Sequence, residues 1–252
     1  MDRLERVCKA LRVGNLKQFV HEVEFHDKEQ YLIEVLELAL RHRENRRIER
    51  LIKQACFPVL KDFVRHDFAR VTFPNGMDKE RLLSLEFIEQ HENILCIGAI
   101  GAGKTSLAVT LGRKACMHGK AVRFYRAVDL ATELADRHRE NTITRLYRQL
   151  AALDMLIIDE LGFIPFDRLA SQLLFNVISA SYQRQSIIVT SNLEFGRWNE
   201  VFGDDRLTAA LIDRLVHYSH ILAFSGPSYR YEQAMLRKEG GGAYLQFAPS
   251  PS

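Results

Sequence analysis

The chain is poor in cysteine and has no long apolar run. Its four cysteines, Cys8, Cys56, Cys96 and Cys116, lie far apart in the sequence, which argues against a zinc motif or a disulfide framework. No apolar run approaches the ~20 residues of a membrane helix, and the polar start does not resemble a signal peptide. We therefore expect a cytoplasmic protein with buried thiols and no membrane partner.

Net charge is also small. The chain carries +3 at pH 7, with 47% hydrophobic and 27% charged residues, as is ordinary for a soluble globular protein. This value alone does not predict a nucleic-acid partner. However, residues 1–70 hold 15 Lys and Arg against 12 Asp and Glu, whereas the remaining residues hold 20 of each sign. The whole positive surplus therefore belongs to the N-terminal part.

The most informative pattern is G-x-x-x-x-G-K-T at Gly98–Thr105, between a short apolar run and a helical pattern. Strand, glycine-rich turn and helix form the phosphate-binding loop of nucleotide hydrolases, where backbone N–H groups face the phosphates. Lys104 is expected to reach the β- and γ-phosphates, and the Thr105 hydroxyl to bind Mg²⁺. The predicted ATP-binding residues are Gly98, Ala99, Ile100, Gly101, Ala102, Gly103, Lys104, Thr105 and Ser106.

A second motif, Met155–Glu160, is typical of a buried strand that ends in two carboxylates. At the carboxyl end of a parallel strand, Asp159 would hold Mg²⁺, and Glu160 would orient and deprotonate the attacking water. Asn192 follows the next strand and could hold that water or a γ-phosphate oxygen, although a turn-forming Asn is the simpler interpretation taken alone.

Strands and helices alternate from Arg81 onward, which predicts an α/β fold with a five-stranded parallel sheet flanked by helices. We expect a helical N-terminal domain at 1–67, a linker at 68–80, a domain with the phosphate-binding loop at 81–239 and a disordered tail at 240–252. The expected strands are Ile94–Gly98, Ala121–Tyr125, Met155–Asp159, Ser186–Ser191 and Ile221–Phe224.

Helical patterns fill the N-terminal part at Leu4–Leu11, Leu16–Val23 and Lys28–Ala55. The third carries a basic stripe that suits a phosphate backbone, although runs of charge are more often solvated helix faces. The candidate DNA-binding residues are Arg43, Arg46, Arg47, Arg50 and Lys53.

Two arginines, Arg206 and Arg214, lie on the predicted helix before the last strand. One interpretation is that they pair with Asp205 and Asp213 at the surface. The other is that one of them reaches the γ-phosphate of a neighbouring subunit, where it would stabilise charge that develops during hydrolysis.

Together these segments resemble the IstB-like AAA+ ATPases, the transposition helpers of bacterial insertion sequences, which are related to the loader DnaC and the initiator DnaA. The similarity rests on Gly98–Thr105, Leu156–Glu160, Thr190–Leu193, Asp205–Leu215 and Arg43–Arg47. It implies an AAA+ fold with a short or absent lid, with Asn192 as first sensor and Arg214 as arginine finger, Arg206 being the second choice. It further implies that the domain at 1–67 is a DNA-binding domain and that the domain at 81–239 is an AAA+ ATPase domain.

The resemblance also implies ATP and Mg²⁺ as cofactors, and duplex DNA, a cognate transposase and further copies of the chain as partners. The subunits would assemble as a ring or spiral, select or deform a target site, and be released by ATP hydrolysis, which DNA and assembly would stimulate. A DnaC-like replicative helicase loader is the alternative, because the catalytic motifs are shared. A metabolic kinase fits less well, since the Asp159–Glu160 pair favours activation of water.

Overall fold

The computed structural model of the chain describes residues 6, 8–9, 12–13, 16–24, 27–58 and 68–226. The predicted helix at Leu4–Leu11 lies largely outside these residues. The predicted tail at 240–252 and the region after Phe224 that concerns the lid also lie outside them, apart from 225–226. Within the described ranges, every helix is too short or too polar to cross a membrane.

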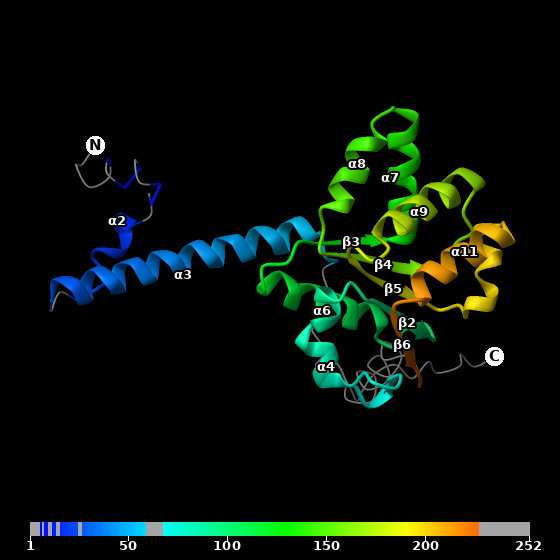
Figure 1. Cartoon of the computed structure of the whole chain (residues 1–252), viewed down its shortest axis with the longest axis horizontal. Helices are drawn as coiled ribbons and strands as arrows, with labels where there is room; N and C mark the ends of the chain where they lie inside the picture. The colour runs from blue at the N-terminus through cyan, green and yellow to red at the C-terminus, as the bar shows by residue number, and fades with distance from the viewer. Residues whose placement is uncertain are drawn as a thin grey trace, which may run out of the picture.

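A single sheet has the strand order β1-β6-β2-β5-β4-β3. It lies among the helices of the domain at one end of the molecule, away from α2 (Leu16–Phe19), as Figure 1 shows. Strands β2 to β6 are parallel, as predicted, and β1 adds an antiparallel edge by pairing with β6. The prediction of five strands is therefore wrong by one, because a two-residue strand leaves no alternation in the sequence. The strands are β1 (Val71–Thr72), β2 (Asn93–Gly98), β3 (Val122–Arg126), β4 (Met155–Leu161), β5 (Ser186–Ser191) and β6 (Ser219–Phe224).

Helices cover both faces of the sheet, because alternate strand residues point to opposite sides. Met155 and Ile157 belong to one apolar cluster with residues of α6, whereas Leu156 and Ile158 belong to a second cluster with residues of α7 and α9. The helices are α4 (Lys79–Ser84), α5 (Glu86–Glu89), α6 (Lys104–Met117), α7 (Ala127–Arg139), α8 (Ile143–Ala151), α9 (Arg168–Ser181), α10 (Asn199–Phe202) and α11 (Asp205–Val216).

The N-terminal part consists of α2 (Leu16–Phe19) and the long helix α3 (Lys28–Ala55), which projects from the sheet domain (Figure 1). The last turn of α3 is anchored: Ala55 is fully buried, and the Arg123 guanidinium of β3 donates to the Gln54 carbonyl over 2.8 Å. Phe57 packs so closely on Gly112 of α6 that a Cβ there would lie 2.6 Å from its ring. Helix α3 is therefore fixed to the helix that follows the glycine loop.

The segment expected to be a linker, 68–80, contains the 3-10 turn η1 (Phe68–Arg70), strand β1 and the first residues of α4. Since β1 is hydrogen-bonded to β6, this segment contributes to the sheet.

The cysteines are free thiols, as expected, but one of them is not buried. Burial raises the pKa of the Cys96 thiol to about 12, so this side chain stays protonated and packs as an apolar group. Cys8 and Cys116 are buried as well, whereas Cys56 is exposed. Cys56 is the residue that caps α3, in the left-handed conformation with φ 56°. The expectation of a buried thiol is wrong for Cys56.

Candidate functional site

The glycine loop connects the end of β2 to the start of α6, as the sequence predicts. Two of its glycines are required by geometry. Gly98 has φ +148° and leaves no room for a side chain, since a Cβ would lie 2.2 Å from the Phe224 carbonyl oxygen. Gly103 has φ +98° at the residue that caps α6. The loop therefore directs the free N–H groups of the first helical turn toward the carboxyl edge of the sheet.

The side chain of Lys104 is folded back onto this loop. Its Nζ donates to the carbonyl oxygens of Gly98, over 2.6 Å, and Ala99, over 2.7 Å. Burial lowers the pKa of Lys104, and the nearby carboxylates act in the opposite direction. The ammonium thus has only weak carbonyl partners, which phosphate oxygens could replace with stronger, charge-assisted bonds.

The remaining loop residues differ in exposure, backbone conformation and hydrogen bonding. Ala102 is buried and the Ile100 side chain is largely exposed. Gly101 takes φ +80°, and the carbonyl of Ser106 accepts from the Thr110 hydroxyl.

The two sequence motifs meet through one hydrogen bond, in which the Thr105 hydroxyl donates to Asp159 Oδ1 over 2.9 Å. Asp159 is buried at the end of β4, and this burial raises its pKa, while hydroxyl bonds from Thr190 and Thr105 lower it. A hard divalent cation accepts oxygen ligands of this type and would favour the charged carboxylate. Thr105 and Asp159 therefore fit a Mg²⁺ site.

Glu160 adopts an unusual backbone conformation beside Asp159. Its φ is +58°, in the left-handed region, and its side chain is exposed. Backbone strain of this kind in a non-glycine residue is found at functional sites. The amide of Glu160 donates to the Thr190 hydroxyl over 2.9 Å, and the same hydroxyl donates to Asp159 Oδ1 over 2.5 Å.

Sequence reasoning missed Thr190, although the residue belongs to the segment Thr190–Leu193 that ends β5. The sequence places Thr190 on the strand expected to precede Asn192, which is the one feature that could have indicated its role. That role also depends on the pairing of β5 with β4, which brings Thr190 to Asp159. Asn192 lies directly after β5 at the same edge and is half-buried. Among described residues, it makes no hydrogen bond to Asp159 or Glu160.

An open cavity of about 550 Å³ contains the proposed reacting groups. Thr105, Asp159 and Glu160 line one part of it, and an ion pair between Arg126 and Asp129, with a nitrogen–oxygen distance of 2.7 Å, lines another. Cys56 and Pro58, which follow α3, also line it, as do residues 123–125 of β3. The end of the long helix therefore borders the same cavity as the two carboxylates.

Neither candidate arginine finger lies in this cavity. Arg214 is near the last turn of α11, where its guanidinium lies 4.8 Å from the ring centre of Phe175 and donates to the Ala210 carbonyl over 3.1 Å. Arg206, in the first turn, is exposed. In the described part of the chain, neither arginine forms the ion pairs with Asp205 or Asp213 that the surface interpretation requires.

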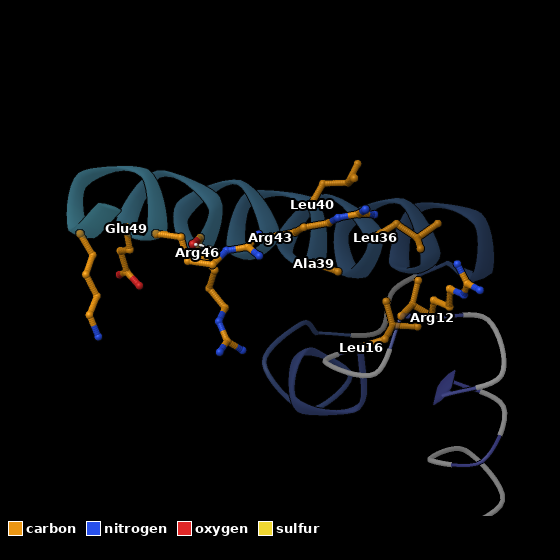
Figure 2. Close-up of a pocket in the computed structure, with 11 residues that line it drawn as sticks. Arg12, Leu16, Leu36, Ala39, Leu40, Arg43, Arg46 and Glu49 are labelled. Carbon is orange, nitrogen blue, oxygen red and sulfur yellow. Dashed lines mark hydrogen bonds between the residues drawn. The ribbon is translucent and has the colours of Figure 1, made fainter. Parts of the chain in front are cut away.

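Four of the five candidate DNA-binding residues share one side of α3. They line a groove of about 600 Å³ together with Glu49, apolar residues of α3 and residues before it. Figure 2 labels Arg43, Arg46 and Glu49 among the lining residues. These four residues are Arg43, Arg46, Arg50 and Lys53, and all are exposed. Arg47 lies elsewhere, because its guanidinium donates to the Gly119 carbonyl over 3.3 Å.

Comparison with known proteins adds a family to this geometry. The family model described as IstB-like ATP binding protein matches residues 3–236. The insertion sequence IS21 ATP-binding protein of Pseudomonas aeruginosa is 36% identical over 249 residues, which cover 95% of this chain and 92% of that protein.

Solved structures share the fold. The replication initiator DnaA, bound to AMPPCP and single-stranded DNA, matches with a TM-score of 0.51 and 19% identity over 69% of this chain and 54% of its own. The DnaC helicase loader matches with a TM-score of 0.50 and 18% identity over 66% of this chain and 100% of its own. The predicted AAA+ type of α/β fold is confirmed. At sequence identities this low, the similarity extends to the fold and not to function.

Proposed function

We propose that this chain, which belongs to the IstB-like ATP-binding protein family, is a Mg²⁺-dependent ATPase that assembles on duplex DNA and assists a transposase. The observation that carries the proposal is the hydrogen bond from Thr105 to Asp159, since it joins the glycine loop and the acidic pair in one cavity. A phosphate loop alone would serve any nucleotide-binding protein. A loop joined to two adjacent carboxylates suits hydrolysis.

Different residues would bind the phosphates and the metal ion. The loop from Gly98 to Ser106 would hold the phosphates through its N–H groups, and Lys104 would leave its carbonyl partners to bind the β- and γ-phosphates. Thr105 and Asp159 would hold Mg²⁺, which supplies charge neutralisation on the phosphates when bound.

Water activation falls to the residues at the open side of the cavity. Glu160, exposed and one residue from the metal ligand, would orient the attacking water and accept its proton. Asn192 would hold the water or a γ-phosphate oxygen from the end of β5. Because Arg206 and Arg214 lie outside their own cavity, one of them, Arg214 first, would act on the ATP of a neighbouring subunit in a ring or spiral.

DNA would bind the basic side of α3 through Arg43, Arg46, Arg50 and Lys53, with Arg47 as a further candidate. These contacts would be to phosphates and independent of sequence. Assembled subunits in the cytoplasm would mark or deform a target site and recruit the cognate transposase, and hydrolysis would release them.

The test uses Glu160→Gln protein, which should bind ATP without hydrolysing it. With ATP and a long duplex, we expect it to sediment as a large oligomer, whereas protein without nucleotide should not. If nucleotide makes no difference to the oligomer on DNA, the proposal fails. A pull-down of the wild-type chain against a replicative helicase ring and duplex DNA separates the helper from a helicase loader, which would prefer the helicase.

A further inference from the structure

Strand β4 contains a bulge at the acidic pair. Ile158 pairs with Val189 and Leu161 pairs with Ser191, so two residues of β4, Asp159 and Glu160, lie opposite one residue of β5. The residue opposite is Thr190. A bulge of this kind leaves one residue unpaired and redirects its side chain. Here it allows neighbouring residues, which would normally face opposite sides of the sheet, to line the same cavity.

The Thr190 side chain compensates for the interrupted ladder. Its hydroxyl accepts from the Glu160 amide over 2.9 Å, in place of a backbone carbonyl. It also donates its one proton to Asp159 Oδ1 over 2.5 Å. Thr190 is 1% exposed, so nothing else can readily take over either bond.

The same hydroxyl determines how Asp159 is presented. Thr105 of α6 and Thr190 of β5 both donate to Oδ1, and Oδ2 makes no hydrogen bond to any described residue. This arrangement fixes the plane of the carboxylate and leaves one oxygen for a cation. A ligand held by two hydroxyl donors keeps its orientation at little cost when the cation arrives.

We propose that Thr190 is a positioning residue for both carboxylates, because its hydroxyl orients Asp159 toward Mg²⁺ and holds Glu160 in the bulged conformation that aims it at water. This inference rests on the proposed ATPase function. It assigns a role to a buried residue of β5 that lies two positions before Asn192.

Two pairs of variants isolate the hydroxyl. Thr190→Val keeps nearly the same shape as the wild-type residue without the hydroxyl. Thr190→Ser and Thr190→Ala both lack the methyl group and differ only in the hydroxyl, so this pair gives the answer if the valine protein does not fold. Ser171→Ala is the matched control, because the Ser171 hydroxyl is also buried and donates to the Phe202 carbonyl, and neither residue lines the cavity.

The first readout is the affinity for a fluorescent ATP analogue, measured once in EDTA and once in Mg²⁺. The affinity in EDTA measures binding of the analogue through the glycine loop without Mg²⁺, and it should be unchanged in every variant. The gain on adding Mg²⁺ should fall about tenfold in Thr190→Val and Thr190→Ala, and should be retained in Thr190→Ser and Ser171→Ala. A loss of about tenfold or more is what removing one hydrogen bond to a charged group produces.

The second readout is the rate of hydrolysis on DNA. kcat should fall by a further tenfold or more in the proteins without the hydroxyl, at saturating Mg²⁺ and ATP, because Glu160 is no longer held. The inference would be overturned if Thr190→Val and the wild type had the same kcat and the same increase in affinity with Mg²⁺. The same result for Thr190→Ala compared with Thr190→Ser would also overturn it. Failure of the proposed function is distinguishable, since the wild-type chain itself would then show no Mg²⁺-dependent binding or no hydrolysis.

Discussion

Asp159 and Lys104 are both buried at the carboxyl edge of the sheet, and both are under electrostatic stress. Burial raises the pKa of the carboxyl and lowers that of the ammonium, so each charged form is disfavoured before ligand binds. Functional sites commonly lower the stability of the folded protein by burying charged groups that later bind a ligand. The stress would be relieved by the opposite charges of Mg²⁺ and phosphate.

Replacing Asp159 with Asn should therefore stabilise the ligand-free protein. The pKa of Asp159 is raised by folding, so the native state loses stability as pH rises from the ordinary aspartate range through the folded pKa. At pH 7 we expect Asp159→Asn to melt roughly 2–4 °C above the wild type, which corresponds to about 1 kcal/mol in a protein of this size.

Calorimetry in EDTA at pH 7 and near pH 4 tests this expectation. The difference should shrink toward pH 4, where the wild-type carboxyl is increasingly protonated in both states. Asp129→Asn serves as control, because Asp129 is exposed and paired with Arg126. A lower melting temperature for Asp159→Asn at pH 7 would contradict the account.

Helix α3 connects two surfaces that the sequence suggests separately. Its C-terminal half carries the basic side chains, and its last turn is held by Arg123 and by the contact of Phe57 with Gly112 on α6. Because Cys56 and Pro58 also border the cavity that contains Asp159 and Glu160, a ligand on the basic side would be attached through one helix to the proposed site of hydrolysis.

Removing two charges from α3 should weaken DNA binding without affecting ATP binding. Arg46→Ala combined with Arg50→Ala should lower affinity for a random duplex and reduce the slope of log K against log salt by about 2, one for each phosphate that is no longer neutralised. Fluorescence anisotropy over a range of salt concentrations measures both quantities.

The matched control for that experiment is Arg41→Ala, since Arg41 is exposed on the same helix but pairs with Glu37 at 3.5 Å. It should leave the slope nearly unchanged. An unchanged slope in the double variant would mean that α3 is a solvated helix and that DNA binds elsewhere.

The elements that could be predicted from sequence are those that are long or that show a clear pattern of apolar residues. Helix Lys28–Ala55 and strand Ser186–Ser191 occur with the predicted bounds, and the other parallel strands differ by a few residues at their ends. Strand β1 could not be predicted, because two residues show no period and their pairing with β6 is a long-range contact. The helix expected at Leu16–Val23 ends at Phe19.

The candidate site was predictable where a motif specifies a local geometry. The glycine loop and the acidic pair are contiguous in sequence, and each lies at the end of a strand whose place in a parallel sheet follows from alternation. Thr190 was not predictable, because its role depends on a bulge in the neighbouring strand. Likewise, only the three-dimensional structure separates Arg47 from the other basic residues of α3.

The whole molecule contains an incomplete catalytic site under the proposed function. Arg214 packs on Phe175 and lies outside the cavity of its own chain. If Arg214 is the arginine finger, a second copy would have to complete the site. A mixture of Lys104→Ala, which should not bind ATP, and Arg214→Ala, which should bind it without hydrolysis, should recover part of the wild-type ATPase rate on DNA.

Each variant alone should be inactive in that mixing experiment. Repeating it with Arg206→Ala decides which arginine acts between subunits. If the mixture is no more active than the two proteins measured separately, while each still joins oligomers on DNA, then neither arginine acts in trans.

The ATPase rate per subunit, measured with and without a long duplex over a range of protein concentrations, bears on all of these points. We expect the rate of the wild-type chain to rise steeply with concentration on DNA and to stay low without it, and Glu160→Gln to remain inactive throughout. A rate that is independent of both DNA and protein concentration would contradict a site that is shared between subunits and completed by assembly.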